Sequence, residues 1–248
     1  MDTELADALF TAYDDGEAVD PGSVPSALTV EDGYAIQDAL AERRGPVAGY
    51  KIGFTNDAVQ SDFGMDAPIY GRVFADTVRT DGGFGYGELV EPLIEPEIAL
   101  VLDRPLSPPV SRLDVAAACR FAVPVIEIVD SRIEGWEFGA AGAVADNALA
   151  ARLVVGDPAP VGETDLSLEG VEVRVGGGRR ASGAGAAALG HPASAVAWLA
   201  DALDERGGRL DSGDIVTTGT LTDPLPVEAG ETVVARFASL GTVTAHAD

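Results

Sequence analysis

Residues 93–102 read Leu-Ile-Glu-Pro-Glu-Ile-Ala-Leu-Val-Leu, a stretch composed mostly of side chains that favour a buried β-strand. Within it, Glu95 and Glu97 stand two positions apart. Because successive side chains of a strand point to opposite faces, both carboxylates face the same side, with Cα atoms about 6.5 Å apart. Two like charges that converge in a poorly solvated place need a compensating cation, since a buried carboxylate otherwise costs several kcal/mol or takes up a proton. A hard divalent metal ion bound by oxygen atoms meets that need.

A second apolar stretch carries a single carboxylate. Residues 121–129 read Phe-Ala-Val-Pro-Val-Ile-Glu-Ile-Val, so Glu127 interrupts another strand-like run. Two such strands could bring three carboxylates to one oxygen-rich site. In a chain with 41 acidic residues, however, a Glu-x-Glu pair also arises by chance. An edge strand with one hydrated face would carry that pair without any metal, and these residues alone leave both interpretations open.

Lys51 is the only lysine in the chain, and the other fifteen basic residues are arginines. It lies in Val47-Ala-Gly-Tyr-Lys-Ile-Gly-Phe54, which has the composition of a strand. Lysine is ordinarily a common surface residue, so a single one retained in an apolar segment indicates a role beyond solubility. A desolvated ammonium shifts its pKa readily and can act in catalysis or hold an anion. The alternative is a lysine whose stem lies along a strand end while its charge reaches water.

Composition narrows the class of protein. The formal net charge is −25 and the isoelectric point is near 4.1, so the chain lacks the basic surface that nucleic-acid binding requires. Acidity spread along the chain, with almost no lysine, is typical of proteins adapted to a salt-rich cytoplasm, where a Debye length of about 3 Å at 1 M salt screens self-repulsion.

The chain also shows no sign of export or membrane insertion. No apolar run is long enough for a membrane span, and the N-terminus, Met1-Asp-Thr-Glu-Leu5, lacks the basic and apolar regions of a signal peptide. We therefore expect a cytoplasmic protein without a membrane partner. The single cysteine, Cys119, rules out an intrachain disulfide and favours a small buried side chain.

The pattern of residues predicts an α+β fold. Helical spacing covers residues 5–13, and Thr29 is suited to cap a second helix that Gly45-Pro46 ends. Two further helices are expected at 112–119 and 192–205. Many strands with few helices indicate mixed or antiparallel sheets, and we expect a helical region over 1–46 followed by a single unit over 47–248. The expected strands are 48–54, 95–102, 121–130, 149–156, 168–175, 214–218, 231–237 and 241–246.

Several spaced motifs together resemble a known family. They are Gly49-Tyr-Lys-Ile-Gly-Phe-Thr55 and residues 71–76, 94–102, 125–133, 144–147, 189–199 and 218–221. Several motifs in the expected order are far more specific than any one of them. In these motifs the chain resembles, over its whole length, the 2-keto-4-pentenoate hydratases and the related 2-oxohept-3-enedioate hydratases and 4-oxalocrotonate decarboxylases of the fumarylacetoacetate hydrolase superfamily.

The resemblance implies a fold, a metal and a homo-oligomer. Similar proteins have a mixed β-roll core preceded by a small helical region, and they bind Mg²⁺ or Mn²⁺ through a Glu-x-Glu pair and a third glutamate. These ligands correspond to Glu95, Glu97 and Glu127, which agrees with the interpretation of the residues themselves. The family lysine corresponds to Lys51, and the aspartate after Phe-Ala corresponds to Asp76.

The implied reaction is hydration, catalysed by a metal-dependent lyase. A metal that chelates a 2-oxo acid stabilises its enolate, and water added at C4 of 2-hydroxypenta-2,4-dienoate gives 4-hydroxy-2-oxopentanoate. Proton transfers need an acid–base pair, for which we expect Asp76 as the base and Lys51 as the oxyanion stabiliser or proton relay. Two alternatives remain: decarboxylation of a 2-oxoenedioate, favoured if Arg72 or Arg132 faces the distal carboxylate, and a non-catalytic protein that binds oxo acids.

Further predictions concern the substrate contacts. Ser182 and Gly183 lie in a stretch, residues 182–185, that resembles a family loop facing the substrate, although an ordinary glycine turn explains it equally well. His191 precedes Pro192, where it either contacts substrate or caps a helix. Asp146-Asn147 either orients the site from behind or forms a turn.

Overall fold

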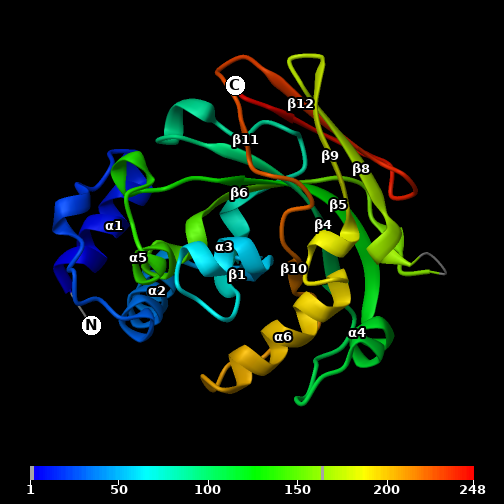
Figure 1. The fold of residues 1–248 in the computed structure, drawn as a ribbon, viewed down its shortest axis with the longest axis horizontal. Coiled ribbons are helices and arrows are strands. Elements are labelled where there is room, and N and C mark those ends of the chain that lie inside the picture. Colours follow the sequence, from blue (N-terminus) through cyan, green and yellow to red (C-terminus); the bar gives the residue numbers. More distant parts are fainter. Residues whose placement is uncertain (1–2, 163–164) are drawn as a thin grey trace.

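A computed structural model describes residues 3–162 and 165–248, in which two β-sheets are flanked by helices on one side and at one end (Figure 1). The α-helices are α1 (Thr3–Asp15), α2 (Val30–Arg44), α3 (Asp57–Asp62), α4 (Arg112–Ala118), α5 (Ala140–Ala145) and α6 (Pro192–Asp204). The strands are β1 (Val47–Gly53), β2 (Ile69–Phe74), β3 (Val78–Arg79), β4 (Leu93–Leu102), β5 (Cys119–Val129), β6 (Ala150–Val155), β7 (Ala159–Pro160), β8 (Gly170–Val175), β9 (Gly178–Ala184), β10 (Ile215–Thr217), β11 (Leu225–Pro226), β12 (Thr232–Phe237) and β13 (Thr242–His246).

The larger sheet is mixed. Its main path runs β2-β1-β10-β4-β5-β6-β3, with β11 paired to β4 and β7 paired to β5. The β1–β10 and β3–β6 pairs are parallel, whereas β1–β2, β10–β4, β4–β5 and β5–β6 are antiparallel. The predicted α+β class with mixed sheets is therefore confirmed. The long strands β4 and β5 form the centre because their apolar side chains are almost all buried.

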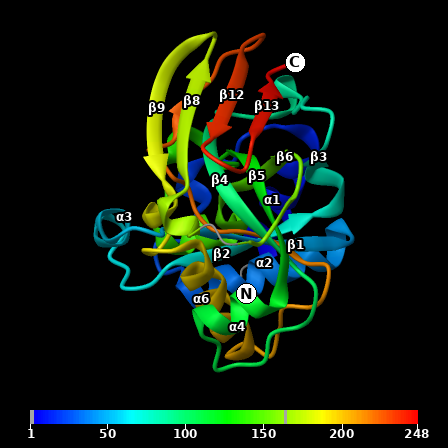
Figure 2. The ribbon, with the colours of Figure 1, turned by 90° about the vertical axis from the view of Figure 1, so that its right-hand side faces the viewer.

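The smaller sheet is antiparallel and has the order β13-β12-β8-β9. Figure 2 shows these four strands side by side at one end of the molecule, with α4 and α6 at the other end. Strands β12 and β13 contact β5 of the larger sheet, and the buried side chains of the smaller sheet share one apolar core with many of those of the larger sheet. A separate cluster on the larger sheet contains Val73, Ala99, Val123, Val125 and Leu153. The curled pair of sheets matches the β-roll that the resemblance implied.

The N-terminal helices pack beside the larger sheet. The cap at Thr29 is present: its hydroxyl accepts the Asp32 amide, and the Asp32 carboxylate accepts the Thr29 amide. Helix α2 packs against α5, and a second buried cluster joins α1 to α2 through Leu5, Leu9 and Ile36. The division at residue 46 stays a prediction. Among the described residues, no helix is long and apolar enough to cross a membrane.

Each of the eight expected strands overlaps an observed one, but seven of the strands and α-helices given above were missed: β2, β3, β7, β9, β11, α3 and α5. Strand β2 contains Gly71 and Arg72, and β9 is polar along its length, so neither has the alternation that marks a strand. Helix α5 has only six residues and begins after Gly139 without a side-chain cap. The expected loop at 182–185 is also corrected, because β9 pairs with β8 as far as Ala184.

Candidate metal centre

The register of the central strands gathers the three glutamates. In the β4–β5 pair, Glu95 lies directly opposite Glu127, and Glu97 lies two residues farther along β4 on the same face. One carboxylate oxygen from each of the three lies within 4.8 Å of the other two. Among the described residues, this is the group of His, Cys, Asp or Glu side chains that could hold a metal ion. The strand pairing therefore forms an all-oxygen site, as hard divalent ions prefer.

Two carboxylate oxygens in this group lack a partner. Glu97 and Glu127 are 0% and 2% exposed, and Oε1 of Glu97 and Oε2 of Glu127 are buried without a hydrogen bond. The other oxygen of Glu97 accepts the Gly219 amide at 2.8 Å. Gly219 has a φ of +106° and lies against Thr55, which a Cβ would approach to 2.4 Å, so only glycine fits there. Buried polar atoms are normally paired, and a cation bound by these two oxygens would pair both.

Lys51 provides one compensating charge. It extends from β1, is 3% exposed, and places its Nζ 3.4 Å from Oε1 of Glu127 and 3.0 Å from the Ala148 carbonyl oxygen, to which it donates. Three carboxylates and one ammonium leave two negative charges uncompensated when all are ionised. A divalent cation supplies the balancing charge, so these residues fit such an ion.

The pKa shifts reflect this crowding. Burial raises the pKa of Glu95 to about 7, against the opposing effect of Lys51. Burial, then repulsion from Glu127 and Glu95, raises the pKa of Glu97 well above its usual value. For Lys51, burial lowers the pKa, but attraction to the carboxylates, with Glu127 the strongest, outweighs burial and leaves the pKa raised. The ammonium therefore keeps its proton at neutral pH, whereas the raised pKa values of Glu95 and Glu97 favour their protonated forms when no metal is bound.

A cavity of about 280 Å³ opens onto this group. Glu95 and Lys51 lie in its wall, together with the polar side chains of Thr55, Asn56, Thr220, Thr222 and Asp223. The rest of the wall is largely apolar and includes four aromatic rings in contact, Phe54, Phe63, Phe138 and Trp136. The cavity thus joins a charged floor to an aromatic wall, which suits a small amphipathic acid.

The structure does not bring Asp76 to this cavity. Asp76 lies just after β2, near Pro46, which precedes β1, whereas Lys51 lies five residues after Pro46. Its carboxylate is 63% exposed and pairs with Arg44 at 3.2 Å. The predicted role of Asp76 as the base therefore finds no support in the geometry, because Asp76 does not line the cavity that contains Glu95 and Lys51.

The predicted substrate contacts also lie outside the cavity wall. Ser182 is exposed on β9, and its hydroxyl accepts a hydrogen bond from Arg179 at 3.1 Å. Gly183 packs tightly against the Leu221 backbone and so lies behind the loop that carries Thr220 and Thr222. His191 caps α6, because its Nδ1 accepts the Ala193 amide at 2.9 Å. The capping interpretation of His191 is the one that the structure supports.

Several site residues were not predicted as such, although residues 218–221 were among the motifs of the family resemblance. The loop that follows β10 supplies the Gly219 amide and the polar wall residues Thr220 and Thr222. Its Thr-Gly-Thr sequence directly after a short strand was a usable signal, because a glycine there allows close backbone approach. The aromatic wall had no such signal, since its rings come from separate loops and from the residue that ends α3.

Comparison with known proteins gives consistent matches. The family model described as fumarylacetoacetate hydrolase C-terminal matches residues 76–247. A 2-keto-4-pentenoate hydratase of Dechloromonas aromatica is 39% identical over 255 residues, covering 99% of this chain and 97% of the relative. A 4-oxalocrotonate decarboxylase of a Pseudomonas species is 37% identical, covering 88% of this chain and 86% of the relative. The solved 4-oxalocrotonate decarboxylase from Pseudomonas putida G7, complexed with magnesium and adipate, is 35% identical with a TM-score of 0.92, covering 98% and 95% of the two chains.

Proposed function

We propose that this chain, which belongs to the fumarylacetoacetate hydrolase family, is a divalent-metal-dependent hydratase. Its substrate is a 2-hydroxy-2,4-dienoate, such as 2-hydroxypenta-2,4-dienoate, and addition of one water gives a 4-hydroxy-2-oxo acid. Such dienoates arise in meta-cleavage catabolism of aromatic compounds. The full-length similarity to a 2-keto-4-pentenoate hydratase supports the assignment.

The metal part of the proposal rests on the donor set. Glu95, Glu97 and Glu127 would hold Mg²⁺ or Mn²⁺ through oxygen atoms, two of which have no partner within the described protein. A magnesium ion in the structure of the decarboxylase relative agrees with that choice. Bound there, the ion supplies Lewis acidity toward the carboxylate and 2-oxo oxygens of the substrate.

The protein itself supplies charge, orientation and exclusion of water. Lys51 lies in the cavity wall with its pKa raised, so its ammonium donates a hydrogen bond and stabilises negative charge that develops on a substrate oxygen. The Ala148 carbonyl and Glu127 hold that ammonium in place. The stacked rings of Phe54 and Phe63, with centroids 4.5 Å apart, line the path of the hydrocarbon part and keep bulk water away from it.

One observation favours hydration over decarboxylation: the described wall of the cavity contains no cation apart from Lys51. A 2-oxoenedioate carries a second carboxylate at its far end, which needs a positive partner. Arg72 is bound to Asp38 and Gln37, and Arg132 is buried against Asp146, so neither reaches the cavity. A hydrocarbon end fits the aromatic wall better. The decarboxylase alternative is supported by the adipate complex of the similar structure, since adipate is a dicarboxylate.

A direct comparison of substrates tests the proposal. Metal-free protein, with and without added Mg²⁺, is given 2-hydroxypenta-2,4-dienoate or 4-oxalocrotonate, and loss of diene absorbance and release of CO₂ are followed. We expect Mg²⁺-dependent hydration of the first and little decarboxylation of the second. Glu127→Gln serves as the inactive control. Faster CO₂ release than hydration would favour the decarboxylase, and no turnover of either would favour the non-catalytic protein.

We also propose a cytoplasmic, salt-adapted homo-oligomer. The net charge of −25 and the single lysine support adaptation to salt, and the family resemblance supports the oligomer. Light scattering of the purified protein in high salt would give the subunit number, and a monomeric mass would contradict the proposed homo-oligomer.

A further inference from the structure

The turn that joins α5 to β6 has an unusual backbone. Asn147, Ala148 and Leu149 are consecutive non-glycine residues with φ values of 53°, 50° and 66°. Side chains disfavour this left-handed region because Cβ approaches the following carbonyl oxygen. Such a conformation persists only where surrounding contacts enforce it, and it is concentrated at functional sites. All three residues are buried.

The side chain of Asn147 provides the first of these contacts. Its Oδ1 accepts the Arg72 amide at 2.7 Å, and its Nδ2 donates to the Arg72 carbonyl at 2.8 Å, so the amide pairs with β2 as a neighbouring strand would. The backbones also touch, because a Cβ on Gly71 would lie 2.1 Å from the Asn147 carbonyl oxygen. Asn147 is 0% exposed, and so this pairing is shielded from competing water.

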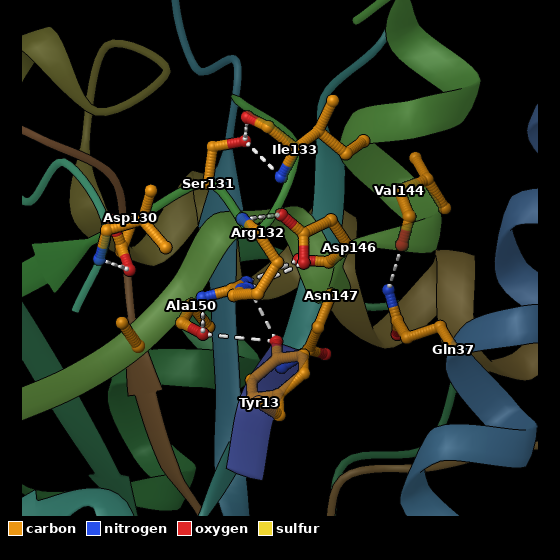
Figure 3. Close-up of polar contacts among 12 residues, drawn as sticks. Tyr13, Gln37, Asp130, Ser131, Arg132, Ile133, Val144, Asp146, Asn147 and Ala150 are labelled. Carbon is orange, nitrogen blue, oxygen red and sulfur yellow. Dashed lines mark hydrogen bonds and ion pairs between the residues drawn. The ribbon is translucent and has the colours of Figure 1, made fainter. Parts of the chain in front are cut away.

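A buried ion pair holds the start of the turn (Figure 3). The Asp146 carboxylate accepts two hydrogen bonds from Arg132, one from Nε at 2.6 Å and one from the backbone amide at 2.8 Å. The same guanidinium donates to the Asp146 carbonyl, to the Tyr13 hydroxyl at 2.8 Å and to the Ala150 carbonyl at 3.2 Å. Arg132 therefore bridges both ends of the turn, from Asp146 to Ala150.

The turn fixes a carbonyl that the site uses. With its backbone constrained on both sides, Ala148 directs its carbonyl oxygen at Nζ of Lys51, 3.0 Å away, and Ala148 and Leu149 line the cavity. The next carbonyl, that of Leu149, accepts the Asp130 amide at 2.9 Å. If Ala148 relaxed to a right-handed conformation, its carbonyl would point elsewhere, and the Lys51 ammonium would lose one of its two partners.

We propose that Asn147 is a positioning residue for Lys51. By pairing with β2, it holds the left-handed turn whose Ala148 carbonyl keeps the ammonium between that oxygen and Glu127. The Arg132–Asp146 pair supports the same turn from its other side. The proposal rests on the role given to Lys51 in the proposed function.

The first test uses Asn147→Gly, which removes the amide pairing but tolerates positive φ, so the fold should survive. We expect kcat to fall on the order of 10-fold or more, because a misplaced catalytic group costs rate more than binding, with KM and Mg²⁺ affinity nearly unchanged. Gln37→Met is the matched control. Gln37 is equally buried, bridges the Tyr70 and Val144 carbonyls and accepts a hydrogen bond from the Arg72 guanidinium, but it contacts neither the Arg72 backbone that Asn147 pairs with nor the turn carbonyl. A comparable fall in kcat for Gln37→Met would show a general loss of packing and overturn the proposal.

A double-mutant cycle separates positioning from general damage. In a Lys51→Met background, Asn147→Gly should have almost no further effect on kcat, since the group that it positions is already gone. An equal loss of kcat in both backgrounds would overturn the proposal. If Lys51→Met alone left kcat unchanged, the role of Lys51 in the proposed function would fail instead.

A spectroscopic readout does not depend on activity. Because Lys51 is the only lysine, protein grown with ¹³Cε-labelled lysine gives one NMR signal from this side chain. We expect that signal of the metal-free protein to shift or broaden in Asn147→Gly and to stay in place in Gln37→Met. An unchanged signal in Asn147→Gly would overturn the proposal. Should Asn147→Gly not fold, Asn147→Asp decides by the same readouts, because it keeps the shape of the side chain and the Oδ1 acceptor but replaces the Nδ2 donor to the Arg72 carbonyl by an oxygen.

Discussion

Replacing Lys51 by methionine separates its charge from its apolar stem. The side chain is 3% exposed and its Nζ is 3.4 Å from a Glu127 carboxylate that is itself buried. In metal-free protein, the substitution leaves that carboxylate without a cation, and breaking a buried pair in this way costs about 3–5 kcal/mol.

The size of the loss should depend on metal. For a chain of this length, about 2–4 °C of Tm corresponds to 1 kcal/mol, so the loss of about 3–5 kcal/mol in Lys51→Met should lower Tm by about 6–20 °C in EDTA. With saturating Mg²⁺ the ion compensates Glu127, and the remaining difference should be the lost hydrogen bond to the Ala148 carbonyl, worth about 1 kcal/mol. Turnover with Mg²⁺ should still fall by a factor on the order of 10² or more.

Thermal unfolding in EDTA and in Mg²⁺, with turnover assayed by loss of diene absorbance, measures both effects. Arg206→Met is the matched control, because it deletes the same charge from a pair with Glu31 on the surface. Its small effect on Tm should not depend on Mg²⁺. A metal-free Tm that Lys51→Met leaves unchanged, or a kcat within threefold of the original, would refute this reasoning.

Three further predictions concern metal, pH and salt. Glu97→Gln or Glu127→Gln should abolish both turnover and the rise in Tm on adding Mg²⁺. The unsubstituted protein, once chelated, should regain turnover on adding Mg²⁺. A chelated, dialysed sample with full turnover would contradict the metal site. Burial raises the pKa of Glu95 from 4.5 to about 7 in metal-free protein, so the folded state binds the extra proton. The stability that this group contributes is present below about pH 4.5 and is lost as pH rises toward 7. Over the same range the Mg²⁺ affinity, measured by calorimetry, should increase because the ion displaces the proton. An affinity that falls would argue against Glu95 as a ligand. Because of the net charge of −25, Tm should rise between about 0.1 M and 2 M KCl as repulsion is screened, and a flat or falling Tm would remove the salt adaptation.

Local patterns determined much of the fold. The runs around Glu95 and Glu127 are apolar enough to predict β4 and β5 without any partner, because burial on both faces requires such composition. The Thr29 cap could be read in the same way, since its contacts reach only to Asp32. By contrast, β9 is polar and becomes a strand only by pairing with β8, which depends on residues elsewhere in the chain.

The same distinction applies to the site. Charged residues embedded in apolar strands are conspicuous because their burial is costly, so the three glutamates and Lys51 could be selected from the sequence. Whether Asp76 joined them could not be decided in that way. It depends on how far along the β1–β2 pair each residue lies, and that register puts Asp76 beside Pro46 and Arg44.

The sequence by itself determined which side chains are too polar for their surroundings, because that conflict lies within a few residues. Only the tertiary structure decided which of them meet and what holds them there. Lys51 and Ala148 are 97 positions apart in the chain, and Asn147 lies 75 positions from Arg72, its partner in β2. Contacts of that kind follow from sheet register and from a turn held in a disfavoured conformation, neither of which local composition specifies.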